Sequence, residues 1–133
     1  MIAADTSVLV AAFASWHESH ATAQEALRGA RLVAHSVVET YSVLTRLPPP
    51  HRVLPGLAAD FLRRVAADAP LTLPAEDVAG LPHLLSGRGI SGGAAYDALI
   101  AVTAMRSGAE LVSLDVRAAA TYRAVGAVHR LLA

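Results

Sequence analysis

Short apolar segments alternate with longer amphipathic segments along this chain of 133 residues, and this alternation limits the fold more than any other feature. The apolar segments have the length of buried strands. They cover residues 2–4, 32–34, 71–73, 110–114 and 127–132. Helices are predicted at residues 8–14, 21–28, 36–47, 55–68, 75–85, 94–107 and 117–125. Strands that alternate with helices predict an α/β sandwich built on a mainly parallel sheet.

The composition fits a single folded domain over residues 1–133. Hydrophobic residues make up 54% of the chain and charged residues 17%, which argues against disorder. The chain has no cysteine, so any metal must be bound by carboxylates or histidines. We find no signal peptide and no apolar run of membrane-spanning length, and we therefore expect a cytoplasmic protein without membrane contact. The mean hydropathy of +0.45 is high and favours a face that binds a partner or a second copy.

Local signals predict where the helices begin and which faces they bury. Thr6 and Ser7 are expected to cap the first helix, and Ser36 forms a capping-box pattern with the acid three residues later. The helix after Ser36 is expected to bury Val37, Val38, Tyr41, Leu44 and Leu47. The helix that begins at Pro55 is expected to bury Leu57, Phe61, Leu62 and Val65.

Four acidic residues lie at corresponding junctions of this pattern. Asp5 and Asp115 directly follow predicted strands, whereas Glu39 and Asp97 lie in the first turns of predicted helices. Because the carboxyl ends of parallel strands meet at one edge of a sheet, we expect these side chains to converge there. Clustered carboxylates stay ionised together only if cations compensate their charge, and Mg²⁺ or Mn²⁺ suits such hard oxygen ligands. A site of this kind can activate water and stabilise the leaving oxygen of a phosphodiester.

Three hydroxyl side chains next to these acids are candidates to hold water or a phosphate. They belong to Thr6, Ser7 and Ser113. Each acid taken alone could instead cap a helix or complement its dipole, and for Glu39 the capping role is as well supported as a metal role. The four acids together favour the metal site.

Four segments of the chain resemble the acidic motifs of the PIN-domain nucleases, in the same order. They are residues 5–9 (DTSVL), 37–47 (VVETYSVLTRL), 96–101 (YDALIA) and 111–115 (LVSLD). The resemblance extends over essentially the whole chain. The short length, the Trp16-His17 pair after the first helix and the loop at residues 89–93 are similar to the VapC toxins of toxin–antitoxin pairs.

The resemblance implies a three-layer α/β/α PIN-like sandwich and a Mg²⁺- or Mn²⁺-dependent endoribonuclease. The metal-binding and catalytic residues carried over from the family are Asp5, Glu39, Asp97 and Asp115. It also implies a VapB-type antitoxin as partner, a homodimer, and contact with DNA only through the antitoxin. The alternative is a catalytically inactive PIN-like binding or scaffold domain whose acids only cap helices.

The chain departs from the family pattern near the fourth acid. Val116 stands where a basic or polar residue is common, and Ala118 stands near a position that is commonly aromatic. Neither departure replaces an acid. They bear on substrate contacts and local packing rather than on the predicted metal site.

Other readings of the sequence are less favoured. His17 and His20 are spaced for one helix face, but without cysteine a zinc site is less favoured than an interface or RNA contact by His17. The loop at residues 87–93 lacks the lysine of a phosphate-binding loop, and no Gly-x-Ser-x-Gly elbow supports a serine hydrolase. The apolar residues between positions 55 and 85 exceed the needs of one small core, so some are expected to form a groove for an amphipathic antitoxin segment.

Overall fold

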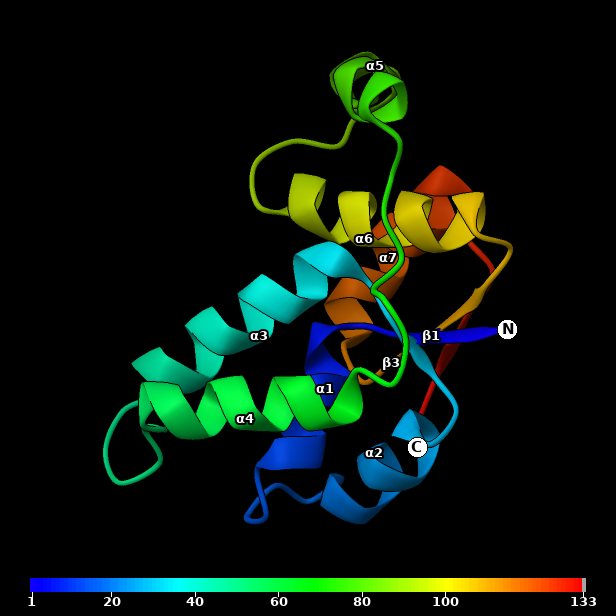
Figure 1. Cartoon of the computed structure of the whole chain (residues 1–133). Helices are drawn as coiled ribbons and strands as arrows, with labels where there is room; N and C mark the ends of the chain where they lie inside the picture. Colours follow the sequence, from blue (N-terminus) through cyan, green and yellow to red (C-terminus); the bar gives the residue numbers. More distant parts are fainter. Residues whose placement is uncertain (133) are drawn as a thin grey trace.

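The computed structural model describes residues 1–132 and contains a four-stranded sheet with helices on both faces (Figure 1). The strands are β1 (Ile2–Ala4), β2 (Arg31–Leu32), β3 (Glu110–Ser113) and β4 (His129–Leu131). The helices are α1 (Thr6–Phe13), α2 (His20–Leu27), α3 (Ala34–Arg46), α4 (Pro55–Val65), α5 (Ala75–Gly87), α6 (Ala94–Arg106) and α7 (Val116–Val125). This arrangement confirms the three-layer α/β/α fold expected from the sequence.

The sheet is parallel throughout, and its strands run in the order β2-β1-β3-β4. Ala4 at the end of β1 pairs with Leu32 on one side and with Val112 on the other. Ser113 at the end of β3 pairs with Leu131. The carboxyl ends of all four strands therefore lie along one edge, where β1 leads into α1 and β3 leads into α7.

Two apolar clusters separate the sheet from its helical layers. Because successive strand residues face opposite sides, Leu111 belongs to one cluster and Val112 to the other. The first cluster includes Ile100 of α6 and Tyr122 of α7, and the second includes Val8, Leu44 and Phe61 from α1, α3 and α4. Figure 1 shows α5 at the outer margin of the molecule, beyond α6. Its residues Leu81 and Leu85 are buried in the first cluster.

The segment at residues 71–73 was predicted as a strand, but it forms only an isolated bridge between Leu71 and Val33. Leu71 is buried and its backbone bonds both Leu32 and Ala34, whereas Leu73 is followed at once by Pro74. Proline cannot donate to a strand ladder, and α5 begins directly after it. The segment therefore extends the edge of the sheet by one bridge.

The helix starts predicted from hydroxyl residues are wrong at both sites. Asp5 itself caps α1, because its side chain accepts from the Val8 N–H, while Thr6 and Ser7 lie inside the helix. The third helix begins at Ala34, with Val33 as N-cap and no side-chain cap. Ser36 is therefore fully buried within the first turn, and Glu39 lies too far along the helix to complete a capping box.

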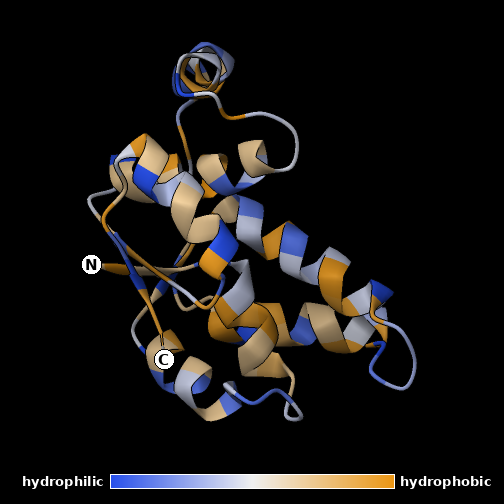
Figure 2. Ribbon diagram, turned by 180° about the vertical axis from the view of Figure 1, so that it is seen from behind, coloured by the Kyte–Doolittle hydropathy of each residue, from blue (hydrophilic) through white to orange (hydrophobic). Residues whose placement is uncertain are grey.

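Several predicted inward faces are also wrong in part. Val38 is 69% exposed and Tyr41 is 37% exposed on α3, and Leu57 is 55% exposed on α4. The buried face of α3 instead carries Ser36, Thr40 and Leu44, which are spaced four residues apart. Apolar and polar residues are interspersed along both α3 and α4 (Figure 2). No helix in residues 1–132 is long and apolar enough to cross a membrane.

Candidate active site

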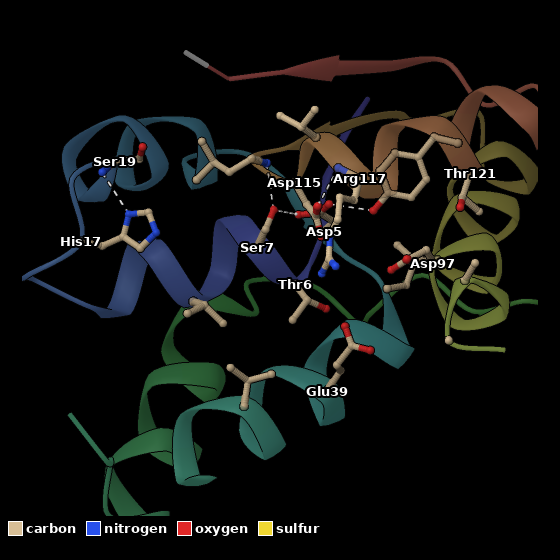
Figure 3. Close-up of a pocket in the computed structure, with 18 of the residues that line it drawn as sticks. Asp5, Thr6, Ser7, His17, Ser19, Glu39, Asp97, Asp115, Arg117 and Thr121 are labelled. Atoms are coloured by element: carbon tan, nitrogen blue, oxygen red, sulfur yellow. Dashed lines mark hydrogen bonds between the residues drawn. The ribbon is translucent and has the colours of Figure 1, made fainter. Parts of the chain in front are cut away.

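A cleft of about 1050 Å³ lies at the carboxyl edge of the sheet and holds all four predicted acids. Asp5 reaches it from the end of β1, Glu39 from α3, and Asp97 from the first turn of α6. Asp115 joins them from the end of β3 (Figure 3). The fold therefore brings together residues that are up to 110 positions apart in the sequence (115 minus 5).

Asp5 is the most rigidly held of the four acids. Its side chain is 2% exposed. One carboxylate oxygen accepts from the Ser7 hydroxyl at 2.5 Å and from the Val8 N–H at 3.3 Å. The other oxygen accepts from the Tyr122 hydroxyl at 2.7 Å. Burial raises the pKa of Asp5, and these donors act in the opposite direction because they stabilise the ionised form.

Two serines connect Asp5 with the end of β3. The Ser7 hydroxyl that donates to Asp5 also accepts from the Leu114 N–H at 2.8 Å. The Ser113 hydroxyl is fully buried and accepts from the Asp115 N–H at 3.0 Å. Ser7 thus links the Asp5 side chain to the backbone after β3, and Ser113, whose hydroxyl lies 3.4 Å from that of Ser7, fixes the backbone N–H of Asp115.

Asp115 begins α7 as its N-cap. Its Oδ1 accepts from the N–H groups of Arg117 at 2.9 Å and Ala118 at 3.2 Å. A carboxylate is also a common N-cap because it complements the positive end of the helix dipole. The Asp115 side chain therefore caps α7 and also lines the cleft.

Glu39 is turned toward a neighbour on its own helix. His35 lies one turn earlier, and its Nε2 is 3.5 Å from a carboxylate oxygen of Glu39. The imidazole of His35 stacks on the ring of Tyr96 with the ring centroids 5.4 Å apart and the planes 3° from parallel. Tyr96 directly precedes Asp97. This stack joins the start of α3 to the start of α6 beside the cleft.

The electrostatics of the cleft act most strongly on Asp97. Partial burial, together with the negative charges of Asp115, Glu39 and Asp5, raises its pKa to about 6. The positive charge of Arg117 partly offsets this effect. A carboxyl group whose pKa is raised both by burial and by neighbouring acids is frequent at functional sites.

Comparison with known proteins identifies the family. The family model for the PIN domain matches residues 2–124, a range that includes all four acids. The chain belongs to the PIN domain family. Within it, Ribonuclease VapC40 of Mycobacterium tuberculosis, from strains CDC 1551 / Oshkosh and ATCC 25618 / H37Rv, is 52% identical over 123 residues, which is 92% of each chain. Ribonuclease VapC27 of strain ATCC 25618 / H37Rv is 44% identical over 134 residues, or 99% of this chain and 96% of the relative. The chain is thus a VapC-type PIN domain.

The donor set of this PIN domain fits a hard divalent cation. The cleft offers carboxylate oxygens, and it is also lined by Thr6, whose buried hydroxyl has no hydrogen-bond partner in the part of the chain that the structure describes. Within residues 1–132, no three acidic or histidine side chains already stand close enough to hold an ion. Arg117 is the positively charged residue that partly offsets the acids around Asp97.

Two residues of the PIN domain site were missed at the sequence level. Tyr122 donates to Asp5 from 117 positions away, and no local pattern marks such a contact. It lies one helical turn after Ala118 and thus supplies an aromatic ring on the same face of α7. Arg117 lines the cleft and places a positive charge next to Val116, where the family pattern led us to expect one. Its position two residues after Asp115 was a signal that could have been used.

Replacing Tyr122 with Phe is expected to lower the free energy of unfolding by about 1–3 kcal/mol, because it leaves a buried Asp5 oxygen without its donor. The ring itself remains to fill its place in the core. Chemical denaturation of the metal-free protein measures the change. Tyr41→Phe is the matched control, since the Tyr41 side chain is partly exposed on α3. Equal stability of the two variants would contradict the role assigned to the phenol.

Proposed function

We propose that this protein is a metal-dependent endoribonuclease that acts as the toxin of a type II toxin–antitoxin system. Asp5, Glu39, Asp97 and Asp115 would hold Mg²⁺ or Mn²⁺ and carry out the hydrolysis of RNA phosphodiester bonds. The observation that carries the proposal is the convergence of these four carboxylates, from four separate elements, in one cleft. The relatives named Ribonuclease VapC40 and Ribonuclease VapC27 support RNA as the substrate.

The chemistry of the proposal divides between the ion and the chain. A bound divalent cation would polarise water and offset the charge that develops on the phosphate. Asp5 would supply a fixed carboxylate, because Ser7, Val8 and Tyr122 hold both of its oxygens. Glu39 and Asp97 are less constrained and would adjust around it. Hydrolysis in this manner would leave a 5′-phosphate and a 3′-hydroxyl.

Two arginines in the cleft suit the phosphates of an RNA strand. Arg117 lies beside the acids, and Arg46 lines the cleft from the last turn of α3. Guanidinium groups bind phosphate oxygens through paired N–H donors. We therefore propose that these two arginines orient the RNA strand. Thr6 would offer its hydroxyl to water or phosphate. Ser7 and Ser113 would support the acids through their hydrogen bonds to the Asp5 side chain and to the Asp115 N–H.

A VapB-type antitoxin is the proposed protein partner. The exposed residues Val38 and Tyr41 lie in an apolar groove of about 460 Å³ between α3 and α4. Its other lining residues are Val37, Ala59, Leu62, Arg63, Ala66 and Pro70. Such a groove suits the apolar face of an amphipathic helix. The proposal further includes a homodimer in the cytoplasm that contacts DNA only through the antitoxin.

The direct test is cleavage of total bacterial RNA by the protein purified free of antitoxin. We expect cleavage in Mg²⁺ or Mn²⁺, no cleavage in a chelator, and RNA ends with 5′-phosphates when the products are mapped. Absence of metal-dependent cleavage would favour the alternative, an inactive PIN-like binding or scaffold domain.

A further inference from the structure

Trp16 is an exposed aromatic residue with an ordered support. It is the only tryptophan in the sequence, and 52% of its surface is exposed. Its ring centroid lies 4.1 Å from that of His51, with the planes inclined by 31°. The centroid of the neighbouring His17 ring lies 6.0 Å from that of Trp16. An indole that is packed against one imidazole and half open to solvent presents a broad aromatic face.

Backbone hydrogen bonds hold both loops that form this stack. In the loop between α1 and α2, the His17 N–H donates to the Ala14 carbonyl at 3.0 Å, and the Ser19 N–H donates to Nδ1 of His17 at 3.0 Å. In the loop between α3 and α4, the His51 N–H donates to the Pro48 carbonyl at 3.0 Å. These bonds restrict the backbone on both sides of the stack, and a restricted backbone lowers the entropy lost on binding.

Trp16 directly precedes the residues at one end of the cleft that holds the acids, although neither Trp16 nor His51 is among the residues that line this cleft. His17 and Ser19 line that cleft, and Figure 3 shows them at the far end of α1 from Asp5. The eight residues of α1 separate the two ends by roughly 12 Å. This is too far for Trp16 to touch the phosphate at the acids, but a strand bound along the cleft would bring a neighbouring nucleotide to it.

We propose that Trp16, supported by His51, stacks on an unpaired base of the RNA strand that the acids cleave. The proposal rests on the ribonuclease function and adds a substrate subsite to it. Every base has a flat π face, so stacking on an aromatic side chain tolerates different sequences but requires a base that is free of its helix. Trp16 is thus a binding and positioning residue, and it selects single-stranded over duplex RNA.

The lone tryptophan provides the test. We would titrate Asp97→Asn protein in Mg²⁺ with a single-stranded oligouridylate, with the same backbone carrying abasic sites, and with an RNA duplex of equal length. Trp16 emission is expected to be quenched to saturation by the single strand and to change little with the other two. A single strand that binds by anisotropy without quenching Trp16 would overturn the proposal while leaving the ribonuclease function intact.

Substitutions test the same contact without relying on fluorescence of the indole. Trp16→Leu is expected to weaken binding of a labelled single strand about tenfold, whereas Trp16→Phe retains most of the affinity. Val128→Ala, which trims an exposed apolar side chain outside the cleft, is the control and should leave RNA affinity unchanged. In the cleaving protein, Trp16→Leu should raise KM with little effect on kcat, as expected for uniform binding.

The remaining outcomes separate the subsite from other uses of Trp16. If Trp16→Leu weakens antitoxin binding and leaves RNA affinity unchanged, Trp16 belongs to the protein interface and the proposal fails. If no form of the protein binds RNA and the unsubstituted chain cleaves none, the ribonuclease function fails together with it. The metal-dependent rise in melting temperature should be the same in Trp16→Leu as in the unsubstituted chain, which shows that the acids are undisturbed.

Discussion

Asp97→Asn is expected to reduce metal-dependent RNA cleavage by at least about 100-fold, because it removes a carboxylate that faces the other three acids across the cleft. The change keeps the size and shape of the side chain. Cleavage rates of purified proteins at saturating Mg²⁺ measure the effect. Asp60→Asn is the matched control, since it removes the same charge from an exposed position on α4. Undiminished cleavage by Asp97→Asn would remove this residue from the catalytic site.

The same substitution should stabilise the metal-free protein by about 1 kcal/mol at pH 7.5, after allowance for the solvent around a partly exposed side chain. The folded-state pKa of Asp97 is raised to about 6 from an ordinary value of 3.8. The folded state therefore binds protons more tightly than the unfolded state, and the free energy of unfolding falls as pH rises from about 4 to about 6. Asp97→Asn should flatten this decline, and denaturation curves at several pH values measure it. A variant less stable than the unsubstituted chain at pH 7.5 would contradict the repulsion described for the cleft.

Saturating Mg²⁺ or Mn²⁺ should raise the melting temperature of the unsubstituted protein by about 10 °C. A ligand at 100 times its dissociation constant stabilises the folded state by about 2.7 kcal/mol, and each kcal/mol shifts the midpoint of a domain of this size by roughly 4 °C. The ion would also replace the repulsion among the acids with attraction. Melting curves with and without the metal measure the shift.

Two controls separate ion binding from general screening. Sodium chloride at matched ionic strength should give a much smaller shift, because it screens the acids without binding between them. Asp60→Asn should keep the shift and Asp5→Asn should lose most of it. If millimolar metal leaves the melting temperature unchanged, the four acids do not form a cation site.

The position of the acids was predictable because it follows from chain order alone. Asp5 and Asp115 come directly after short apolar strands, and parallel strands that end at one edge must bring such residues together. The contacts that hold them were less predictable. Ser113 was a candidate to hold water or a phosphate, and the structure adds that its buried hydroxyl accepts from the Asp115 N–H. A hydroxyl group can donate and accept, so its hydrogen-bond partners depend on which groups the fold places near it.

The faces of α3 show where sequence patterns were insufficient. Apolar spacing predicted that Val38 and Tyr41 would be buried, yet both are exposed along the groove beside α4. The spacing identifies an apolar face of the helix, but it does not show whether that face packs against the core or binds a partner. Ser36 and Thr40 occupy the inward positions together with Leu44, because these three residues share one face of α3.

The sequence by itself determined the layered α/β fold, the order of its acidic segments and the edge of the sheet where they meet. Those features depend on the periodicity within each segment and on the order of the segments along the chain, and both can be read directly from the sequence. Only the tertiary structure decided that Tyr122 holds Asp5 and that Trp16 rests on His51. Both contacts depend on how helices and loops pack, and their partners are 117 and 35 positions apart (122 minus 5, and 51 minus 16). No local pattern in the chain encodes such a distance.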